Sequence, residues 1–162
     1  MGLDIYFEKR KNDLAALKKF HEAVQAREDY AEKTYKEGIG YTDDEKAEYR
    51  RLDAIVDELN PRKEIGYFRK VNFLMDFFNY EGNCEYKEIP LECFNELKER
   101  CEKVLADHSL ADELLPTQSG FFFGSTDYDE WYFKNVEAVR DFCQKVLNET
   151  EPDEVIEMYC WW

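Results

Sequence analysis

The sequence predicts an α+β protein that is mostly helical, with a small antiparallel sheet that pairs its N- and C-terminal strands. Long stretches repeat apolar residues at steps of three and four, the period of a helix with one buried face. The opening segment Leu3–Phe7 alternates apolar and polar residues, and the tail Val155–Trp162 is apolar and rich in β-forming residues. Pairing these two segments is the most economical way to bury both.

Residues 11–60 are predicted to form a helical hairpin that is inserted into a single domain spanning residues 1–162. Asn12 or Asp13 can cap a first helix that runs to about Glu37 and stops at the glycines that follow. Thr42 starts a second helix, and Glu45 completes a capping box three residues later. The second helix ends at Asn60–Pro61. The apolar positions are Leu14, Leu17, Phe20 and Val24 in the first helix, and Tyr49, Leu52, Val56 and Leu59 in the second.

The remaining elements alternate between helix and short strand. A third helix, near Tyr67–Tyr80, is apolar over most of its circumference and is expected at the centre of the fold. Asn83–Pro90 reads as a short strand. It is followed by a fourth helix, a helical turn at Ser109–Leu115, and a last helix over about Tyr128–Asn148. The apolar face of the fourth helix comprises Leu91, Phe94, Leu97, Cys101, Val104 and Leu105.

The net charge of −15 is the strongest compositional signal. Acidic residues outnumber basic ones by 19 to 7 between Glu85 and Trp162, and no basic stripe exists. Such a surface repels phosphates, so direct binding to duplex DNA or RNA is not expected. The acidity either keeps the chain in solution or forms a face that meets a basic partner, for example by imitating nucleic acid.

Cysteine and histidine usage argues against metal and nucleophile chemistry. The five cysteines form no CxxC pair, and neither His21 nor His108 has a second ligand at metal-binding spacing. No apolar stretch approaches the ~20 residues of a membrane span. We therefore expect a reduced intracellular protein without a cofactor, a metal or a membrane anchor, and no enzymatic activity. A homo-oligomer is compatible with this sequence.

The predicted third helix carries a polar stripe formed by Arg69, Asn72 and Asp76. A charge on a buried helix is costly unless it is paired. One interpretation is an internal ion pair between Arg69 and Asp76. The other is the wall of a recess, in which the guanidinium of Arg69 meets a phosphate or carboxylate.

The segment from Leu115 to Tyr132, LPTQSGFFFGSTDYDEWY, is the most informative part of the sequence. Three consecutive phenylalanines stand between Gly120 and Gly124 and are surrounded by hydroxyl and amide side chains. This mixture suits a planar polar molecule that stacks on aromatic rings. Alternatively, the phenylalanines pack under the sheet and Thr126 caps the last helix with Asp129 as its capping-box partner. A magnesium site at Asp127, Asp129 and Glu130 is a further alternative.

Four motifs resemble a family of small, poorly characterised proteins encoded by tailed phages and prophages. They are MGLDIYFEK, EIGYFRKVN, NCEYKEI and LLPTQSGFFFGSTDYDEWY. The resemblance covers residues 1–9 and about 64–150. Relative to shorter relatives the hairpin at 11–60 looks like an insertion, and the CWW ending differs. The resemblance implies a phage accessory protein that acts in the host cytoplasm, often in counter-defence.

Two functional hypotheses follow. The first is a non-enzymatic protein that binds and sequesters a small anionic, nucleotide-like ligand such as a host immune signal. The second is an acidic inhibitor that binds the surface of a host protein. The ligand-binding residues expected under the first hypothesis are Arg69, Lys70, Asn72, Asp76, Gln118, Phe121, Phe122, Phe123, Ser125, Thr126, Tyr128 and Trp131.

Overall fold

The computed structural model of the chain describes residues 2–162 and divides them into two compact units. The first, the sheet unit, contains the residues up to Arg10 together with Lys63–Trp162. The second, the hairpin unit, is Lys11–Arg62. Helices make up 53% of the structure, which confirms a mostly helical α+β fold. Each unit is described by itself below.

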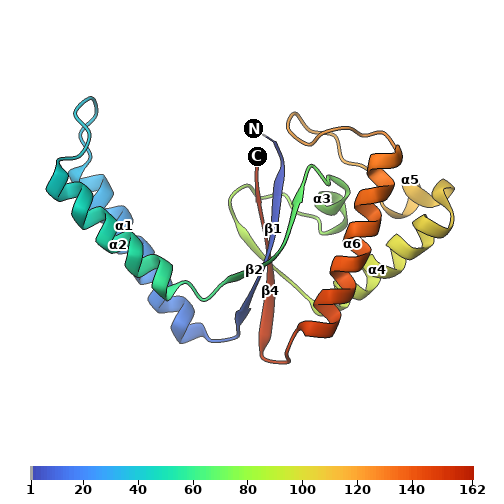
Figure 1. Cartoon of the computed structure of the whole chain (residues 1–162), viewed down its shortest axis with the longest axis horizontal. Helices are drawn as coiled ribbons and strands as arrows, with labels where there is room; N and C mark the ends of the chain where they lie inside the picture. Colours follow the sequence, from blue (N-terminus) through green and yellow to red (C-terminus); the bar gives the residue numbers. More distant parts are fainter. Residues whose placement is uncertain (1) are drawn as a thin grey trace. The chain divides into compact units, whose positions relative to one another are not determined.

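The sheet unit is built on a four-stranded antiparallel sheet in the order β2-β1-β4-β3. The strands are β1 (Asp4–Lys11), β2 (Lys63–Arg69), β3 (Tyr86–Ile89) and β4 (Glu154–Trp161). The predicted pairing of the N- and C-terminal strands is confirmed, because β1 and β4 lie side by side in the middle of the sheet (Figure 1). The short strand expected within Asn83–Pro90 is β3, an edge strand.

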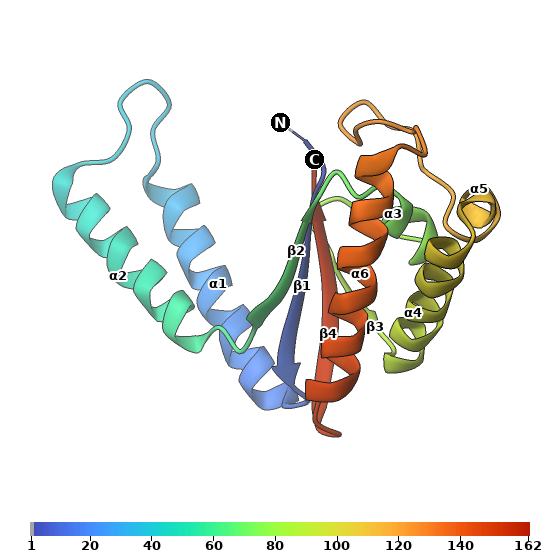
Figure 2. The same cartoon turned by 45° about the vertical axis from the view of Figure 1, so that its right-hand side comes forward.

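Four helices of the sheet unit lie on one face of this sheet (Figures 1 and 2). They are α3 (Phe73–Phe77), α4 (Leu91–Ala106), α5 (Ala111–Leu114) and α6 (Glu130–Glu149). Alternate strand residues point toward the helices, so each strand contributes one side of its pleat to the core. The core includes Ile5, Phe7, Phe73, Leu74, Phe94, Leu97, Val136, Val139, Ile156 and Met158.

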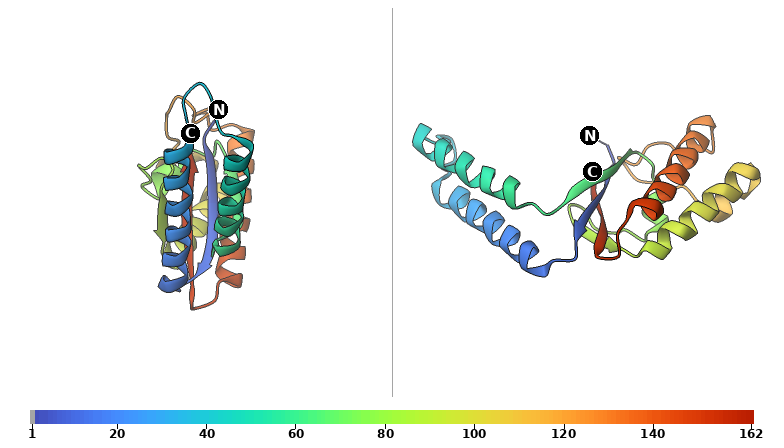
Figure 3. Two further views of the ribbon diagram at one scale, coloured as in Figure 1. Left: turned by 90° about the vertical axis from the view of Figure 1, so that its left-hand side faces the viewer. Right: turned by 60° about the horizontal axis from the view of Figure 1, so that its bottom comes forward.

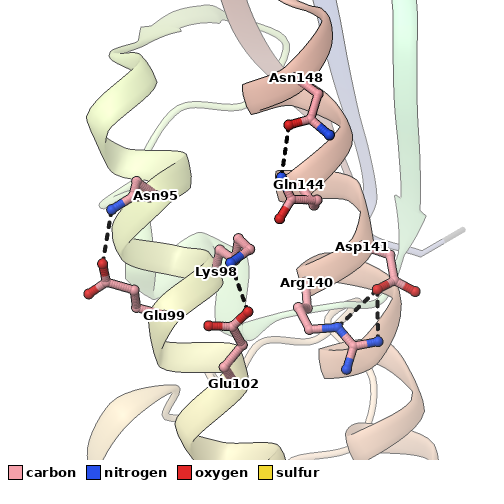
Figure 4. A network of polar contacts seen from close by, with 8 residues as sticks. All are labelled: Asn95, Lys98, Glu99, Glu102, Arg140, Asp141, Gln144 and Asn148. Atoms are coloured by element: carbon pink, nitrogen blue, oxygen red, sulfur yellow. Dashed lines mark hydrogen bonds and ion pairs between the residues drawn. The ribbon is translucent and has the colours of Figure 1, made fainter.

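In α4 and α6 the apolar residues are spaced so that they fall on the side that packs in the core, and the opposite, outer side of each helix is polar. Figure 4 shows that their polar side chains contact neighbours on their own helix. Lys98 pairs with Glu102 at 2.7 Å, and Gln144 donates to the amide oxygen of Asn148 at 2.9 Å. These i,i+4 contacts stabilise each helix in water.

The helix predicted over Tyr67–Tyr80 is wrong in its first half. Lys63–Arg69 is strand β2, and helix α3 covers only Phe73–Phe77. Part of the reason is Gly66, which faces Phe7 across the strand pair at a β-bulge. A Cβ on Gly66 would stand 2.4 Å from the ring of Phe142, so the glycine lets α6 approach β2 closely. The expectation of burial is confirmed for α3, where Phe73 and Leu74 lie in the core.

The hairpin unit contains α1 (Leu14–Thr34) and α2 (Asp43–Leu59), which lie side by side (Figure 3). The side chain of Asp13 caps α1 by accepting from the backbone N–H groups of residues 15 and 16. At the start of α2 the predicted capping box is confirmed. The Thr42 hydroxyl accepts from the Glu45 N–H, and the Glu45 carboxylate accepts from the Thr42 N–H.

Replacing Asp13–Asn60 with a short Gly-Ser linker should leave a chain that still unfolds cooperatively. Strands β1 and β2 pair with Lys9 opposite Lys63, so the two ends that the linker must join already lie close together. A short loop can close such an antiparallel pair. Thermal unfolding followed by circular dichroism tests this prediction. A broad, non-cooperative transition in the shortened chain would show that the sheet unit needs residues 13–60 to fold.

Among the described residues, no helix combines the length and apolar character needed to cross a membrane.

Candidate functional site

The loop that connects α5 to α6 is held in place by one buried amide, Asn72. Its Nδ2 donates to the carbonyl oxygens of Phe123 at 3.1 Å and Ser125 at 2.9 Å. Its Oδ1 accepts from the backbone N–H of Gln118 at 3.3 Å. Asn72 is only 3% exposed, so these contacts replace its hydrogen bonds to water. The predicted site residue Asn72 therefore anchors both sides of the loop.

The three phenylalanines of this loop have three different environments. Phe123 is buried, with its ring edge-on to Trp162 at 5.4 Å. Phe122 is half-buried, and its carbonyl oxygen accepts from the N–H of Leu3 at 2.9 Å. The side chain of Phe121 is 96% exposed. One of the two interpretations of the three phenylalanines was that they pack under the sheet. Burial in the core applies to Phe123, whereas Phe121 is exposed to solvent.

The hydroxyl groups of the loop are engaged within the loop and its neighbours. Ser125 Oγ donates to the Asp127 carboxylate at 3.0 Å, and Thr117 Oγ1 donates to the Thr126 carbonyl oxygen at 3.0 Å. The hydroxyl of Tyr128 donates to Asp112 at 2.7 Å. These contacts give the loop a defined conformation.

The predicted cap of the last helix lies three residues too early. Helix α6 begins at Glu130, and its N-cap is Asp129, whose carboxylate accepts from the N–H of Tyr132 at 2.9 Å. Thr126 is exposed and belongs to the preceding loop. The reason is the DYD sequence, in which a second capping residue follows closely after Thr126.

Some of the predicted ligand-binding residues meet at one small pocket. Lys70, Asn72, Ser125 and Trp131 line it, together with Asp127 and Asp129, and its volume is about 70 Å³. Pockets that enclose small-molecule ligands usually measure about 300–1,000 Å³. One ammonium group also faces two carboxylates, which disfavours an anion. The other predicted residues do not line this pocket: Arg69, Asp76, Gln118, Phe121, Phe122, Phe123, Thr126 and Tyr128.

Arg69 and Asp76 do not lie on a common helix. Arg69 ends strand β2, and its guanidinium lies 3.7 Å from the carboxylate of Asp4, whereas Asp76 is exposed on α3. The same Asp4 carboxylate accepts from the hydroxyl of Tyr67. This hydrogen bond, and then burial, raises the pKa of Tyr67. The internal pair of Arg69 with Asp76, one of the two interpretations of the polar stripe, is therefore replaced by a pair of Arg69 with Asp4.

Three buried thiols stay protonated at neutral pH. Burial raises the pKa of Cys101 and of Cys160 to about 12, and it raises the pKa of Cys143 as well. Among the residues that the structure describes, no group of three or more His, Cys, Asp or Glu side chains could hold a metal ion.

The second surface of interest is the face of the sheet opposite the helices, here called the open face. No helix of the sheet unit covers it (Figure 2). Each strand contributes one tyrosine to a continuous row: Tyr67, Tyr6, Tyr159 and Tyr86. Neighbouring ring centroids in this row lie 5.0, 6.2 and 4.9 Å apart. Burial raises the pKa of Tyr159 to about 12.

A row of glutamates runs beside the tyrosines. Glu88 stands opposite Glu157, and each lies two residues from the tyrosine of its strand. Glu8 stands opposite Glu64, which lies three residues from Tyr67 because of the β-bulge. Sequence reasoning missed both rows because they require the register of all four strands, and β2 was not recognised. The available signal was the alternation Tyr6–Glu8, Tyr86–Glu88 and Glu157–Tyr159.

Comparison with family models, with curated proteins and with solved structures finds no match to this chain. The resemblance to phage-encoded proteins is not tested by this result and stays a prediction.

Proposed function

We propose that this chain is a non-enzymatic binding protein that covers part of the surface of another protein, with Phe121 as an anchor. The observation that carries the proposal is the 96% exposure of the Phe121 side chain on a loop of defined conformation. Exposing a phenylalanine forgoes about 1.5–3 kcal/mol of burial free energy, which a bound partner can recover. Aromatic side chains are also enriched in protein interfaces, and Phe is among them.

The anchoring of the loop supports this role further. Asn72 holds the carbonyl oxygens of residues 123 and 125, and Phe122 is tied to Leu3, so little conformational entropy is lost when Phe121 is bound. The net charge of −15 supports a partner with a basic surface. The resemblance to phage-encoded proteins supports a host protein as this partner, and inhibition of host defence as the result.

A photo-crosslinker placed at position 121 tests the proposal. We expect p-benzoylphenylalanine at this position to give one protein adduct in a bacterial host extract. The same crosslinker at Glu137, exposed on the outer face of α6, should not give that adduct. Excess unlabelled chain should compete the adduct away, and excess Phe121→Ser chain should not. Equal competition by both chains would overturn the role of Phe121.

Sequestration of a nucleotide-like ligand is the second candidate, because Lys70, Ser125 and Trp131 line one pocket. Its volume of about 70 Å³ leaves most of a nucleotide outside. Native mass spectrometry of the purified chain separates the two candidates. A protein-binding role predicts no nucleotide-sized additional mass. A nucleotide-sized additional mass that Lys70→Ala or Trp131→Ala removes would support sequestration instead.

A further inference from the structure

We infer that the open face of the sheet binds an uncharged, flat glycan chain of the β-1,4-linked glucan type. This surface uses none of the loop residues on which the proposed function rests. It carries a recess of about 450 Å³, lined by Tyr6, Glu8, Glu64, Tyr86, Tyr159 and Trp161. Among the described residues, this lining consists of aromatic rings and carboxylates only.

Aromatic rings extend beyond the recess and across the whole sheet. The tyrosine row places one ring on every strand, and Trp161 follows Tyr159 two positions later on the same face of β4. Tyr67 and Tyr86, at the two ends of the row, are each 44% exposed, and Trp161 is 45% exposed. Neighbouring rings of the row contact one another, so they are held in place before a ligand binds. Binding therefore costs little side-chain entropy.

A sugar ring with equatorial hydroxyls matches this combination of groups. In a β-1,4-linked glucan every hydroxyl is equatorial, so both faces of each ring present C–H groups and the edges present O–H groups. The C–H faces can pack on aromatic rings while the O–H edges donate to carboxylates. Binding sites for small molecules commonly combine aromatic walls with a few polar groups in this way.

The carboxylates can accept hydrogen bonds from a sugar even where they also pair with a cation. A carboxylate offers about four lone-pair positions, and one ion pair does not use all of them. Glu88, on the same face, illustrates this, because its Oε1 lies 2.6 Å from Arg10 Nη2 and yet its side chain is 65% exposed. An uncharged partner is thus compatible with the ion pairs of this face. A chain that carries phosphates is repelled by the net charge of −15.

The spacing of the strands favours a flat and extended chain. Neighbouring strands lie about 5 Å apart, so the tyrosine row spans about 15 Å. A hexose in an extended glucan is about as long as one strand spacing, so about three hexoses cover the row. An α-1,4-linked glucan curls instead and turns its rings in changing directions. Only the β-1,4-linked chain can therefore stack several rings on the row at once.

Isothermal titration calorimetry of the full chain with cellohexaose tests the inference. We expect saturable binding of cellohexaose, and at least about fivefold weaker binding of its α-1,4-linked isomer maltohexaose, because fewer rings stack. Trp161→Ala and Glu64→Ala should each weaken cellohexaose binding at least about fivefold. The matched controls Tyr35→Ala and Glu113→Ala remove an exposed aromatic ring and an exposed carboxylate elsewhere, and they should bind normally.

Melting temperatures separate the effect on binding from a loss of structure. Glu64 and Trp161 are exposed, so both variants should melt within a few degrees of the unaltered chain. In amide spectra of the unaltered chain, cellohexaose should shift resonances of β1–β4, which keeps the test valid if a variant fails to fold. Absence of saturable binding, equal binding of the two glucans, or normal binding by either variant would overturn the inference. Shifts confined to residues outside the sheet would overturn it too.

Discussion

A chain that ends at Glu154 should lose cooperative unfolding altogether. Strand β4 lies between β1 and β3, so removal of residues 155–162 breaks two strand pairs and leaves β3 without a strand neighbour in the described sheet. Ile156 and Met158 are at most 2% exposed, and burial of each contributes about 1.5–3 kcal/mol. Their loss, together with two broken ladders, approaches the 5–15 kcal/mol by which a whole domain is stabilised.

Circular dichroism during heating measures this effect, and Trp161→Ser is the matched control. Trp161 belongs to the same strand but is 45% exposed, so its replacement should shift the melting temperature by only a few degrees. If the truncated chain melts in a sharp transition near that of the full chain, the central position of β4 cannot be correct.

Arg10→Met should lower the free energy of unfolding by about 3–5 kcal/mol. Arg10 and Glu157 have side chains that are 2% and 4% exposed, and they form an ion pair at 3.1 Å. Without the guanidinium, Glu157 keeps its negative charge in a buried position next to Glu88 across the strand pair. Urea denaturation followed by tryptophan fluorescence gives the difference in free energy.

The double change Arg10→Met with Glu157→Leu should recover much of this loss, because both charges of the pair are then removed together. Arg51→Met is a control for loss of an arginine, since Arg51 pairs with Glu48 on an exposed helix surface. Its replacement should change the free energy of unfolding far less than Arg10→Met does. A cost for Arg10→Met as small as that for Arg51→Met would refute the buried pair.

Local signals in the sequence predicted the helical elements well. Asp13 and Thr42 cap α1 and α2 because their side-chain oxygens accept from N–H groups two or three residues away, an interaction that depends on neighbours only. Strand β2 was not predicted because it depends on contacts that are distant in the sequence. Residues 63–69 form a strand because β1 pairs with them and Phe142 covers Gly66, and neither partner is near in sequence.

In the candidate site, too, the features set by local sequence were predicted and those set by distant contacts were not. The GFFFGST loop was recognised from its composition, but its environment could not be. Asn72 reaches residues 123 and 125 from about fifty positions away, and this distant contact decides which phenylalanine is buried. Both interpretations of the polar stripe Arg69–Asn72–Asp76 assumed one continuous helix, which the structure replaces with β2 and α3.

The place of β4 in the sheet also determines when the protein can fold during synthesis. Helices α1 and α2 contact each other and are close together in the sequence, so they can form early on the ribosome. The sheet must wait for residues 154–161, because the strand made last among the four fills its centre. Until then one edge of β1 stays unpaired, a state prone to aggregation.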